Sequence, residues 1–376
     1  MESKVMEFKH CVVEGTAYEA GEQLGNLLKA DKAFIQEMTT PLFGGSKLSK
    51  DQITRVKELY NKFCPGTNEE MKGFADAIGA NVDDVVYYFA FLQNRIGNCS
   101  HIALTPSITE KGHTYLGRNY DYSWEDKPIL IETRIKGQYK QIGFGCQIFG
   151  RFDGMNEHGL CITTSSGVIN PNYKEEGFVF PVIVRALLNN CKTVKEAIKV
   201  FASMKVADYR NFMIIDRYGD AALIEAAASK KAIKRAGDTY EDKYLFSTNH
   251  YNIPDMIKLG FPRVRHSITR YKAIKAYIEA ALPKVSISEL KNILSTTMPE
   301  GVCCHHYKDG MGTLWSIVFD PMESEANICF GSPSVNQWKT FHINNPVGNN
   351  TFTAILPNES TYPDFWEQES NHIPNR

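Results

Sequence analysis

The spacing of apolar residues changes near residue 98, and this change constrains the fold more than any other feature. Up to that point, apolar residues recur mostly at helical intervals, at 16–29, 50–63, 68–78 and 82–89, after a short alternating segment at 7–14. Beyond it, the spacing falls toward two, which is typical of strands. The sequence therefore divides into a mainly helical region, 1–98, and a β-rich region, 99–376, and we expect one intertwined body.

The β-rich region interleaves runs of strands with paired helices. Helices are expected at 180–190, 193–204, 267–281 and 286–294, and strands at 101–104, 114–118, 129–135, 139–144, 159–164, 212–216, 221–226, 244–248, 313–319, 326–330 and 340–343. Antiparallel strand runs with helices in pairs favour a layered α+β body in which sheet packs on sheet. The absence of strict strand–helix alternation argues against a doubly wound parallel sheet. The tail, 344–376, is rich in Asn and Pro and is expected to wrap irregularly.

Composition narrows the class of protein. Lys and Arg number 42 against 43 Asp and Glu, and the net charge of −1 argues against a general nucleic-acid or membrane-surface binder. No apolar run approaches the roughly 18 residues of a membrane helix, and residues 1–10 contain no apolar signal-peptide core. Nine scattered cysteines are expected to be reduced thiols. We therefore expect a cytoplasmic protein.

The most tempting metal signal is the run Cys303-Cys304-His305-His306. Adjacent strand residues point to opposite faces, so these four side chains do not easily surround one ion. Zinc ligands are usually separated by two to four residues. We expect a strand end with two buried and two exposed residues, and no metal or other cofactor.

The chemistry-bearing residues lie in five separate motifs. Cys99 stands at the boundary between the two regions, and Gly-Arg-Asn-Tyr-Asp follows at 117–121. Asn156 lies in a polar turn, Asn249 ends a strand, and Arg270 lies near the start of a helix. Taken one by one, each motif also fits a structural role, such as a buried thiol, an ion pair or a turn.

Together and in this order, the motifs resemble the autoproteolytic acyl-coenzyme A:6-aminopenicillanic acid acyltransferase (isopenicillin N acyltransferase) family. The similarity begins with Gly-Thr-Ala-Tyr-Glu at 15–19 and runs to Thr-Leu-Trp-Ser-Ile-Val-Phe-Asp at 313–320, so it covers most of the chain except the tail. These enzymes are N-terminal nucleophile hydrolases, and choloylglycine hydrolases are more distant relatives. The resemblance implies a four-layer αββα sandwich and self-cleavage between Asn98 and Cys99. Fragments 1–98 and 99–376 would stay associated, and the sequence leaves higher oligomers open.

The resemblance also assigns roles to individual residues. Cys99 is the nucleophile, Asp121 holds its α-amine, and Asn249 is the side-chain donor to the oxyanion. The second donor is expected to be a backbone N–H near Ser165 or Ser166.

Three further residues complete the expected site. Arg118 matches the bile-salt hydrolase branch, where an arginine near the thiol favours the thiolate. Arg270 matches the arginine at the family's helix start, and an anchoring role in the Asp121 network is nearly as good a reading. Asn156 is expected to form a turn that supports the site from outside.

Cleavage before Cys99 has a physical rationale of its own. A thiol with a pKa of about 8.5 is mostly protonated at neutral pH and needs a base. An amide nitrogen is no base, whereas a free α-amine has a pKa of about 7.7–8.0, near the pH at which the enzyme works. Nucleophile and base would then belong to one residue, and no histidine need pair with Cys99.

The sequence thus predicts an enzyme that cleaves a non-peptide C–N amide bond through a Cys99 thioester and passes the acyl group to water. An amine acceptor, with an acyl-coenzyme A or amide donor, is the alternative. A small-molecule amide is the expected partner, with pocket walls at 124–127, 168–173 and 254–262. Two rivals remain open: an uncleaved protein that binds a small ligand, and a Cys–His hydrolase using His250 or His158.

Overall fold

The protein is a sandwich of two β-sheets. The computed structural model describes residues 2–39, 48–91, 98–145, 149–167, 177–207, 209–228, 230–237, 243–260 and 262–369. The larger sheet has nine strands, in the order β10 (Lys230–Arg235), β9 (Ala221–Ala227), β8 (Tyr209–Ile215), β7 (Cys161–Ser166), β6 (Asp153–Asn156), β5 (Gln141–Gly145), β4 (Ile129–Ile135), β1 (Glu2–Gly15) and β17 (Asn350–Asn358). The smaller has β11 (Tyr244–Ser247), β2 (Asn98–Leu104), β3 (Tyr115–Tyr122), β14 (Met311–Asp320), β15 (Glu325–Phe330) and β16 (Trp338–His342), with β13 (His305–His306) beside β14.

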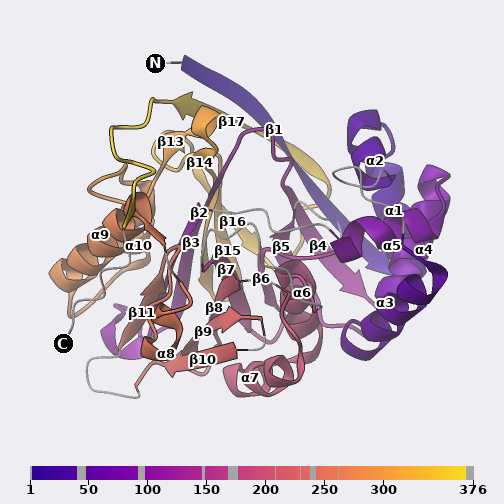
Figure 1. Ribbon diagram of the computed structural model, residues 1–376, viewed down its shortest axis with the longest axis horizontal. Helices are drawn as coiled ribbons and strands as arrows, with labels where there is room; N and C mark the ends of the chain where they lie inside the picture. The colour runs from indigo at the N-terminus through magenta and orange to yellow at the C-terminus, as the bar shows by residue number, and fades with distance from the viewer. Residues whose placement is uncertain are drawn as a thin grey trace.

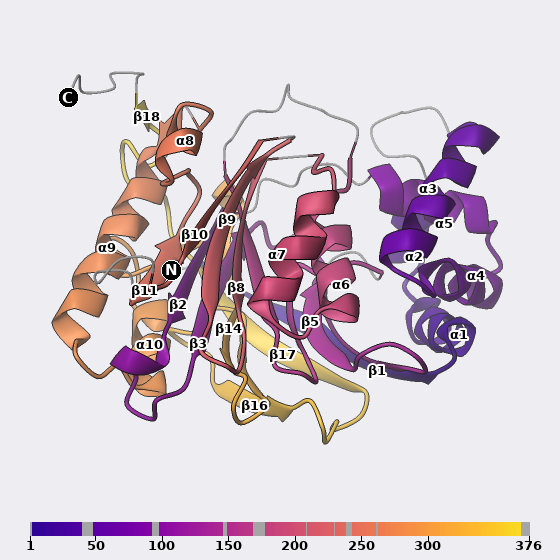
Figure 2. The same ribbon diagram turned by 90° about the horizontal axis from the view of Figure 1, so that it is seen from below.

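Helices cover the outer face of each sheet. Helices α6 (Phe180–Asn190) and α7 (Val194–Ser203) lie on the larger sheet, and α9 (Arg265–Ala281) and α10 (Ile287–Ser295) lie on the smaller one (Figures 1 and 2). The four layers run helix, sheet, sheet, helix, so the predicted αββα sandwich is confirmed.

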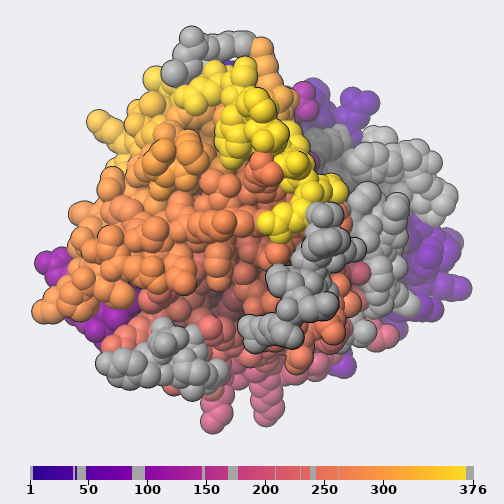
Figure 3. All heavy atoms as spheres, turned by 60° about the vertical axis from the view of Figure 1, so that its left-hand side comes forward, coloured from indigo at the N-terminus to yellow at the C-terminus, as the bar shows by residue number. Residues whose placement is uncertain are grey.

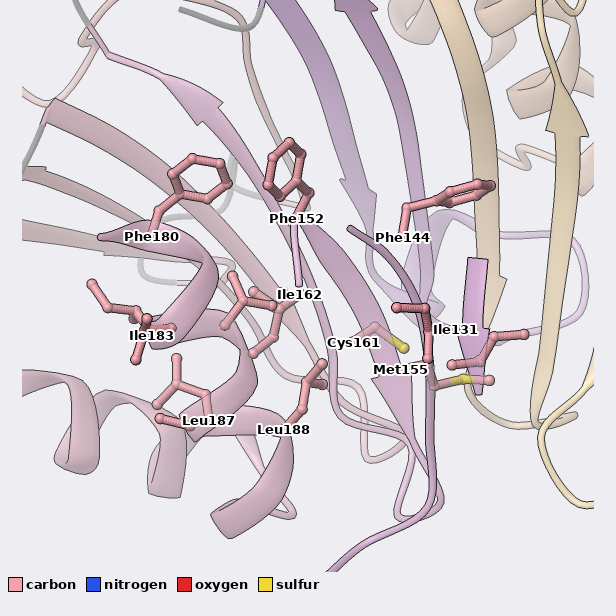
Figure 4. Close-up of a cluster of buried hydrophobic side chains, with 14 of the residues drawn as sticks. Ile131, Phe144, Phe152, Met155, Cys161, Ile162, Phe180, Ile183, Leu187 and Leu188 are labelled. Carbon is pink, nitrogen blue, oxygen red and sulfur yellow. The ribbon is translucent and has the colours of Figure 1, made fainter. Parts of the chain in front are cut away.

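The helical layer over the larger sheet is held by apolar packing. Pro181 stands in the first turn of α6, where a missing backbone N–H does no harm. Ile183, Leu187 and Leu188 of this helix belong to the same buried apolar cluster as Met155 and Ile162 of the sheet (Figure 4). Each such buried side chain contributes about 1.5–3 kcal/mol relative to exposure, so this face fixes the helix on the sheet.

The described residues before β2 form one strand and a cluster of helices. Strand β1 lies inside the nine-stranded sheet, parallel to β4 and antiparallel to β17. The helices are α1 (Ala17–Leu28), α2 (Lys32–Thr39), α3 (Lys50–Phe63), α4 (Thr67–Ile78) and α5 (Val82–Phe91). Helices α1 and α4 meet backbone to backbone, because a Cβ on Gly73 would come within 2.0 Å of the Tyr18 carbonyl oxygen. Buried Arg185 of α6 pairs with Glu70 of α4 at 2.7 Å and ties the cluster to the sandwich.

The prediction that the C-terminal tail wraps irregularly was wrong for two of its segments, which form strands. Residues 350–358 form β17, which pairs with β1 from Glu2 to His10 at the edge of the larger sheet. Later in the tail, a short strand, Gln368–Glu369 (β18), pairs with Arg263–Val264 (β12). The tail thereby reaches the α9 side of the molecule, where its yellow atoms lie beside orange ones on the surface (Figure 3).

A short helix, α8 (Pro254–Ile257), and two 3₁₀ turns, Pro106–Ile108 and Tyr307–Asp309, complete the described elements. The described helices include none that is both long and apolar enough to cross a membrane.

Candidate active site

The β2–β3 hairpin places Cys99 between two polar surroundings. In its antiparallel register, Cys99 lies opposite Tyr120 and Asn98 lies opposite Asp121. Directly opposite residues share a face and successive residues alternate. Cys99 and Arg118 therefore face the interior of the sandwich, whereas Asn98 and Asp121 face the α9 layer.

Arg118 contacts the thiol from the interior side. Its Nη2 lies 3.4 Å from Cys99 Sγ, and its Nη1 donates to the buried carboxylate of Asp153. The guanidinium also lies 5.1 Å from the ring centre of Tyr120 and 5.5 Å from that of Trp315. Burial raises the pKa of the Cys99 thiol, and the positive charge of Arg118 opposes that rise.

Asn249 and Arg270 contact the backbone of Cys99. The backbone N–H of Cys99 donates to Asn249 Oδ1 at 3.0 Å. Arg270 donates to the Cys99 carbonyl oxygen at 2.8 Å, to Ser100 Oγ at 2.8 Å and to Asn249 Oδ1 at 2.7 Å. The side chain of Arg270 is fully buried, so the fold commits it to this contact.

Asp121 is a buried carboxyl group beside the Asn98–Cys99 bond. Its Oδ1 accepts from Thr313 at 2.7 Å. Its Oδ2 has no hydrogen-bond partner within the described part of the chain and lies 3.8 Å from Arg270 Nη1. Burial raises the pKa of Asp121 to about 7, although Arg270 and Thr313 lower it. The group therefore titrates near neutral pH.

The strand ladder distinguishes the backbone N–H groups of the two residues expected near the oxyanion, Ser165 and Ser166. Strand β7 pairs with β8, and Gly167 N–H donates to the Tyr209 carbonyl just beyond the two strands. Because hydrogen-bonded pairs alternate in an antiparallel ladder, Ser165 also bonds to β8, and the backbone N–H of Ser166 points to the opposite edge. On that edge, Asn249 Nδ2 donates to the Ser166 carbonyl oxygen at 3.3 Å. Ser166 N–H and Asn249 Nδ2 thus lie together.

The side chains of two other sequence-derived candidates, Asn156 and Ser165, hold neighbouring backbone groups. The amide of Asn156 bonds the carbonyls of Leu188 and Cys191 and the N–H groups of His158 and Leu160, so it fixes a turn. Ser165 Oγ donates to the Thr248 carbonyl at 2.6 Å.

Neither histidine proposed for a Cys–His hydrolase, His250 or His158, is placed as a base for the Cys99 thiol. Burial lowers the pKa of His250 to about 3, and its Nδ1 lies 2.8 Å from Ser267 Oγ. His158 packs against Tyr139 at a ring distance of 4.3 Å. Among the described residues, no histidine hydrogen-bonds the Cys99 thiol.

The run 303–306 has all four side chains buried, so the expected split into two buried and two exposed residues was wrong. The two histidines are covered because Glu359, in the tail, bonds both of them. Within the described ranges, no group of three or more His, Cys, Asp or Glu side chains is arranged to hold a metal ion. Of the expected pocket walls, residues 168–173 and Phe261 lie outside the described residues.

Two residues of the site were missed from the sequence. Asp153, on β6 of the opposite sheet, holds Arg118 and accepts from Trp315 Nε1 at 2.8 Å. Ser267 accepts from the backbone N–H of Asn249 at 2.8 Å. Ser267 could have been found from the sequence, because it stands three residues before Arg270 at the start of the predicted helix.

Comparison with known families fits this arrangement. The model of the family described as acyl-coenzyme A:6-aminopenicillanic acid acyl-transferase matches residues 108–335, more than half of the chain. The chain belongs to this family. The matched segment contains Arg118, Asp121, Asn249 and Arg270 and begins after Cys99.

Two solved structures are similar to this chain. A variant of the conjugated bile acid hydrolase from Clostridium perfringens is 14% identical, with a TM-score of 0.50 over 73% of this chain and 100% of that chain. The penicillin V acylase from Agrobacterium tumefaciens is 17% identical, with a TM-score of 0.48 over 65% of this chain and 86% of that chain. No curated protein matched the sequence. The first of these comparisons, with the layer order, identifies the sandwich as that of the N-terminal nucleophile hydrolases.

Proposed function

We propose that this family member is an N-terminal cysteine nucleophile enzyme. It cuts its own chain between Asn98 and Cys99 and then cleaves a non-peptide C–N amide bond through a Cys99 thioester, with water as the acyl acceptor. The observation that carries the proposal is the set of contacts on one residue. Arg118 lies on the Cys99 sulfur, Asn249 on its nitrogen and Arg270 on its carbonyl oxygen.

Maturation begins with attack of Cys99 Sγ on the Asn98 carbonyl carbon. The C–N bond breaks, the thiol proton passes to the nitrogen of Cys99, and a thioester remains. Water then hydrolyses the thioester to the Asn98 carboxylate and regenerates the thiol. Ser166 N–H and Asn249 Nδ2 would stabilise the oxyanion, and loss of one such donor typically costs 10²–10³-fold in rate.

Turnover uses the amine that the cut releases. The α-amine of Cys99 takes the thiol proton and gives it to the leaving nitrogen of the substrate amide. It then takes a proton from the water that attacks the thioester. Asn249 Oδ1, which accepts from this nitrogen at 3.0 Å in the uncut chain, would orient the amine. Asp121 Oδ2 would accept from the new ammonium.

The two fragments would remain one body after the cut. Strand β1 is paired along both edges inside the larger sheet, and Glu70 of the N-terminal fragment pairs with buried Arg185. Separation would expose the sheet interior and break the buried ion pair. The proposed mature protein is therefore a tight complex of residues 1–98 and 99–376.

Transfer of the acyl group to an amine is the second candidate. The description of the matching family, an acyl-coenzyme A-dependent transferase, favours it. The thioester would form in the same way, and an amine in place of water would attack it. The two reactions differ only in the acceptor.

The test is the mass of the purified protein after denaturation. Two species, one ending at Asn98 and one beginning at Cys99, support maturation; a full-length chain that is nonetheless active would refute it. The mass of the smaller fragment also reports the route, because cyclisation of the Asn98 side chain would leave it lighter by one water. Cys99→Ala should abolish both cutting and turnover.

Activity is tested on penicillin V, a conjugated bile acid and an N-acylethanolamine, with release of the free acid as the readout. A mixture of an acyl-coenzyme A and 6-aminopenicillanic acid tests transfer. If the chain stays whole, cleaves none of these amides and gains thermal stability from one of them, a binding protein is the better description.

A further inference from the structure

Two buried polar side chains lie next to the site without a role in the proposed chemistry. Asn211 on β8 and Glu225 on β9 are direct neighbours in the antiparallel ladder, and both are fully buried. An unpaired carboxylate in such a place is costly, so its partners show what it is there to hold.

Glu225 holds the backbone of the turn that follows β11. Its Oε1 accepts from the N–H of Asn252 at 2.6 Å, and its Oε2 accepts from the N–H of Ile253 at 3.0 Å. Burial raises the pKa of Glu225 to about 7, and these two backbone hydrogen bonds lower it. Both carboxylate oxygens are therefore engaged with one short segment.

Asn211 holds the beginning of the same turn. Its Nδ2 lies 3.1 Å from the Thr248 carbonyl oxygen, 3.4 Å from the His250 carbonyl oxygen and 3.1 Å from Ser165 Oγ. The next residue on β9 adds a third attachment, because the Ala226 carbonyl accepts from Tyr251 Oη at 2.5 Å.

Asn249 lies within this turn, residues 248–253, which Asn211 and Glu225 hold in place. The residues on both sides of it bond to Asn211, and its own N–H donates to Ser267 Oγ at 2.8 Å. Its side chain reaches Cys99 N with one end and the Ser166 carbonyl with the other. A shift of the turn would therefore displace both ends of the amide from the reacting atoms.

We infer that Asn211 and Glu225 are positioning residues, which anchor the turn 248–253 to the larger sheet so that the Asn249 amide stays aligned with Cys99. The inference rests on the proposed function for its catalytic consequence. Its structural part, the coupling of Glu225 to the Cys99 N–H, is independent of that function.

The chain supplies a matched control. Asp216, just beyond the other end of β8, is also a buried carboxylate that accepts from backbone N–H groups, those of Val194, Tyr218 and Asp220. It holds α7 and a turn away from the site. Glu225→Gln and Asp216→Asn each replace one acceptor oxygen by a donor, so both should lower the melting temperature.

The first measurement uses the Cys99→Ala chain, which cannot mature by the proposed route. Amide hydrogen exchange is followed at residues 99, 252 and 253. Glu225→Gln should speed exchange at all three positions, and Asp216→Asn should leave residue 99 unchanged. Faster exchange at 252 and 253 with no change at 99 would overturn the inference, whatever the protein catalyses.

The second measurement compares kcat and KM in an otherwise wild-type chain, with the amide that the wild type cleaves fastest. Glu225→Gln should lower kcat about 10- to 100-fold with KM nearly unchanged, because a misplaced catalytic group costs rate more than binding. Asn211→Asp, which removes the donor, should do the same, and Asp216→Asn should stay within about twofold of wild type. Equal kcat in all three variants would refute the positioning role, whereas activity that survives Cys99→Ala would refute the proposed function instead.

Discussion

Arg118 offers the sharpest test of the electrostatics at the site. Its Nη2 lies 3.4 Å from Cys99 Sγ, and opposite unit charges at that distance attract by roughly 5 kcal/mol at an effective dielectric constant of about 20. Neighbouring charges usually shift a pKa by about 1–3 units. Removal of the guanidinium should therefore raise the pKa of the Cys99 thiol by about 1–3 units, and the thiolate fraction at neutral pH should fall about 10- to 1,000-fold.

The Arg118 substitution has to be combined with a second substitution at Asp153. Arg118→Met alone would leave the buried carboxylate of Asp153 unpaired, which commonly destabilises a protein by about 3–5 kcal/mol. Asp153→Asn removes that charge and keeps an oxygen for Trp315 Nε1, which donates at 2.8 Å. The informative protein is the double variant, with Asp153→Asn alone as its control.

The assay is the pH dependence of alkylation of Cys99 by iodoacetamide, read by mass spectrometry on the peptide that contains Cys99. Cut and uncut chains give different peptides and are followed separately. The double variant should react more slowly at neutral pH and reach the wild-type rate only at higher pH. Superimposable pH profiles for the double variant and its control would show that Arg118 does not set the thiol pKa.

Three further predictions follow from buried groups. Because the pKa of Asp121 rises from 3.8 to about 7 on folding, its contribution to stability is present below about pH 4 and lost as the pH passes 7. In the Cys99→Ala chain, unfolding by urea should show that, between about pH 4 and pH 7, the free energy of unfolding of the Asp121→Asn variant rises by about 1.4 kcal/mol per pH unit relative to that of its parent. Parallel plots of the free energy of unfolding against pH would contradict this. Glu70→Ala should lower the free energy of unfolding by about 3 kcal/mol, because it leaves Arg185 buried without its partner, and it should leave kcat unchanged. Cys161→Ala should cost about 1 kcal/mol without loss of turnover, and a loss of activity would mean that a second thiol takes part.

Local signals in the sequence predicted local structure well. The capping box at Thr16 and Glu19 and the cap at Thr193 both form, because each needs only residues within one turn of helix. Strand β17 was missed for the opposite reason. Its partner is β1, more than 300 residues earlier, and although Phe352, Ala354 and Leu356 alternate with more exposed residues, nothing within 350–358 identifies that partner.

The same contrast between local signals and long-range contacts applies to the candidate site. Cys99, Asn249 and Arg270 stand in recognisable motifs, and the structure brings them into contact. The partner of Arg118 was not visible in the sequence. Asp121, three residues away, was the ion-pair partner that the sequence suggested. In the β2–β3 ladder, however, Arg118 faces the interior and Asp121 faces the helical layer. Arg118 therefore pairs with Asp153 of the opposite sheet.

The charges around Cys99 indicate how the proposed cut would activate the site without disrupting it. Arg118 is balanced by Asp153, and Arg270 lies nearest Asp121, so the buried cluster is close to neutral while the thiol keeps its proton. Ionisation of the thiol alone would add an uncompensated negative charge, which burial disfavours. A cut before Cys99 supplies an amine on the same residue, and proton transfer from sulfur to nitrogen adds one negative and one positive charge together. The nitrogen faces Asn249 Oδ1, and Asp121 Oδ2 beside it has no hydrogen-bond partner among the described residues. The pair can therefore form without changing the net charge of the buried cluster.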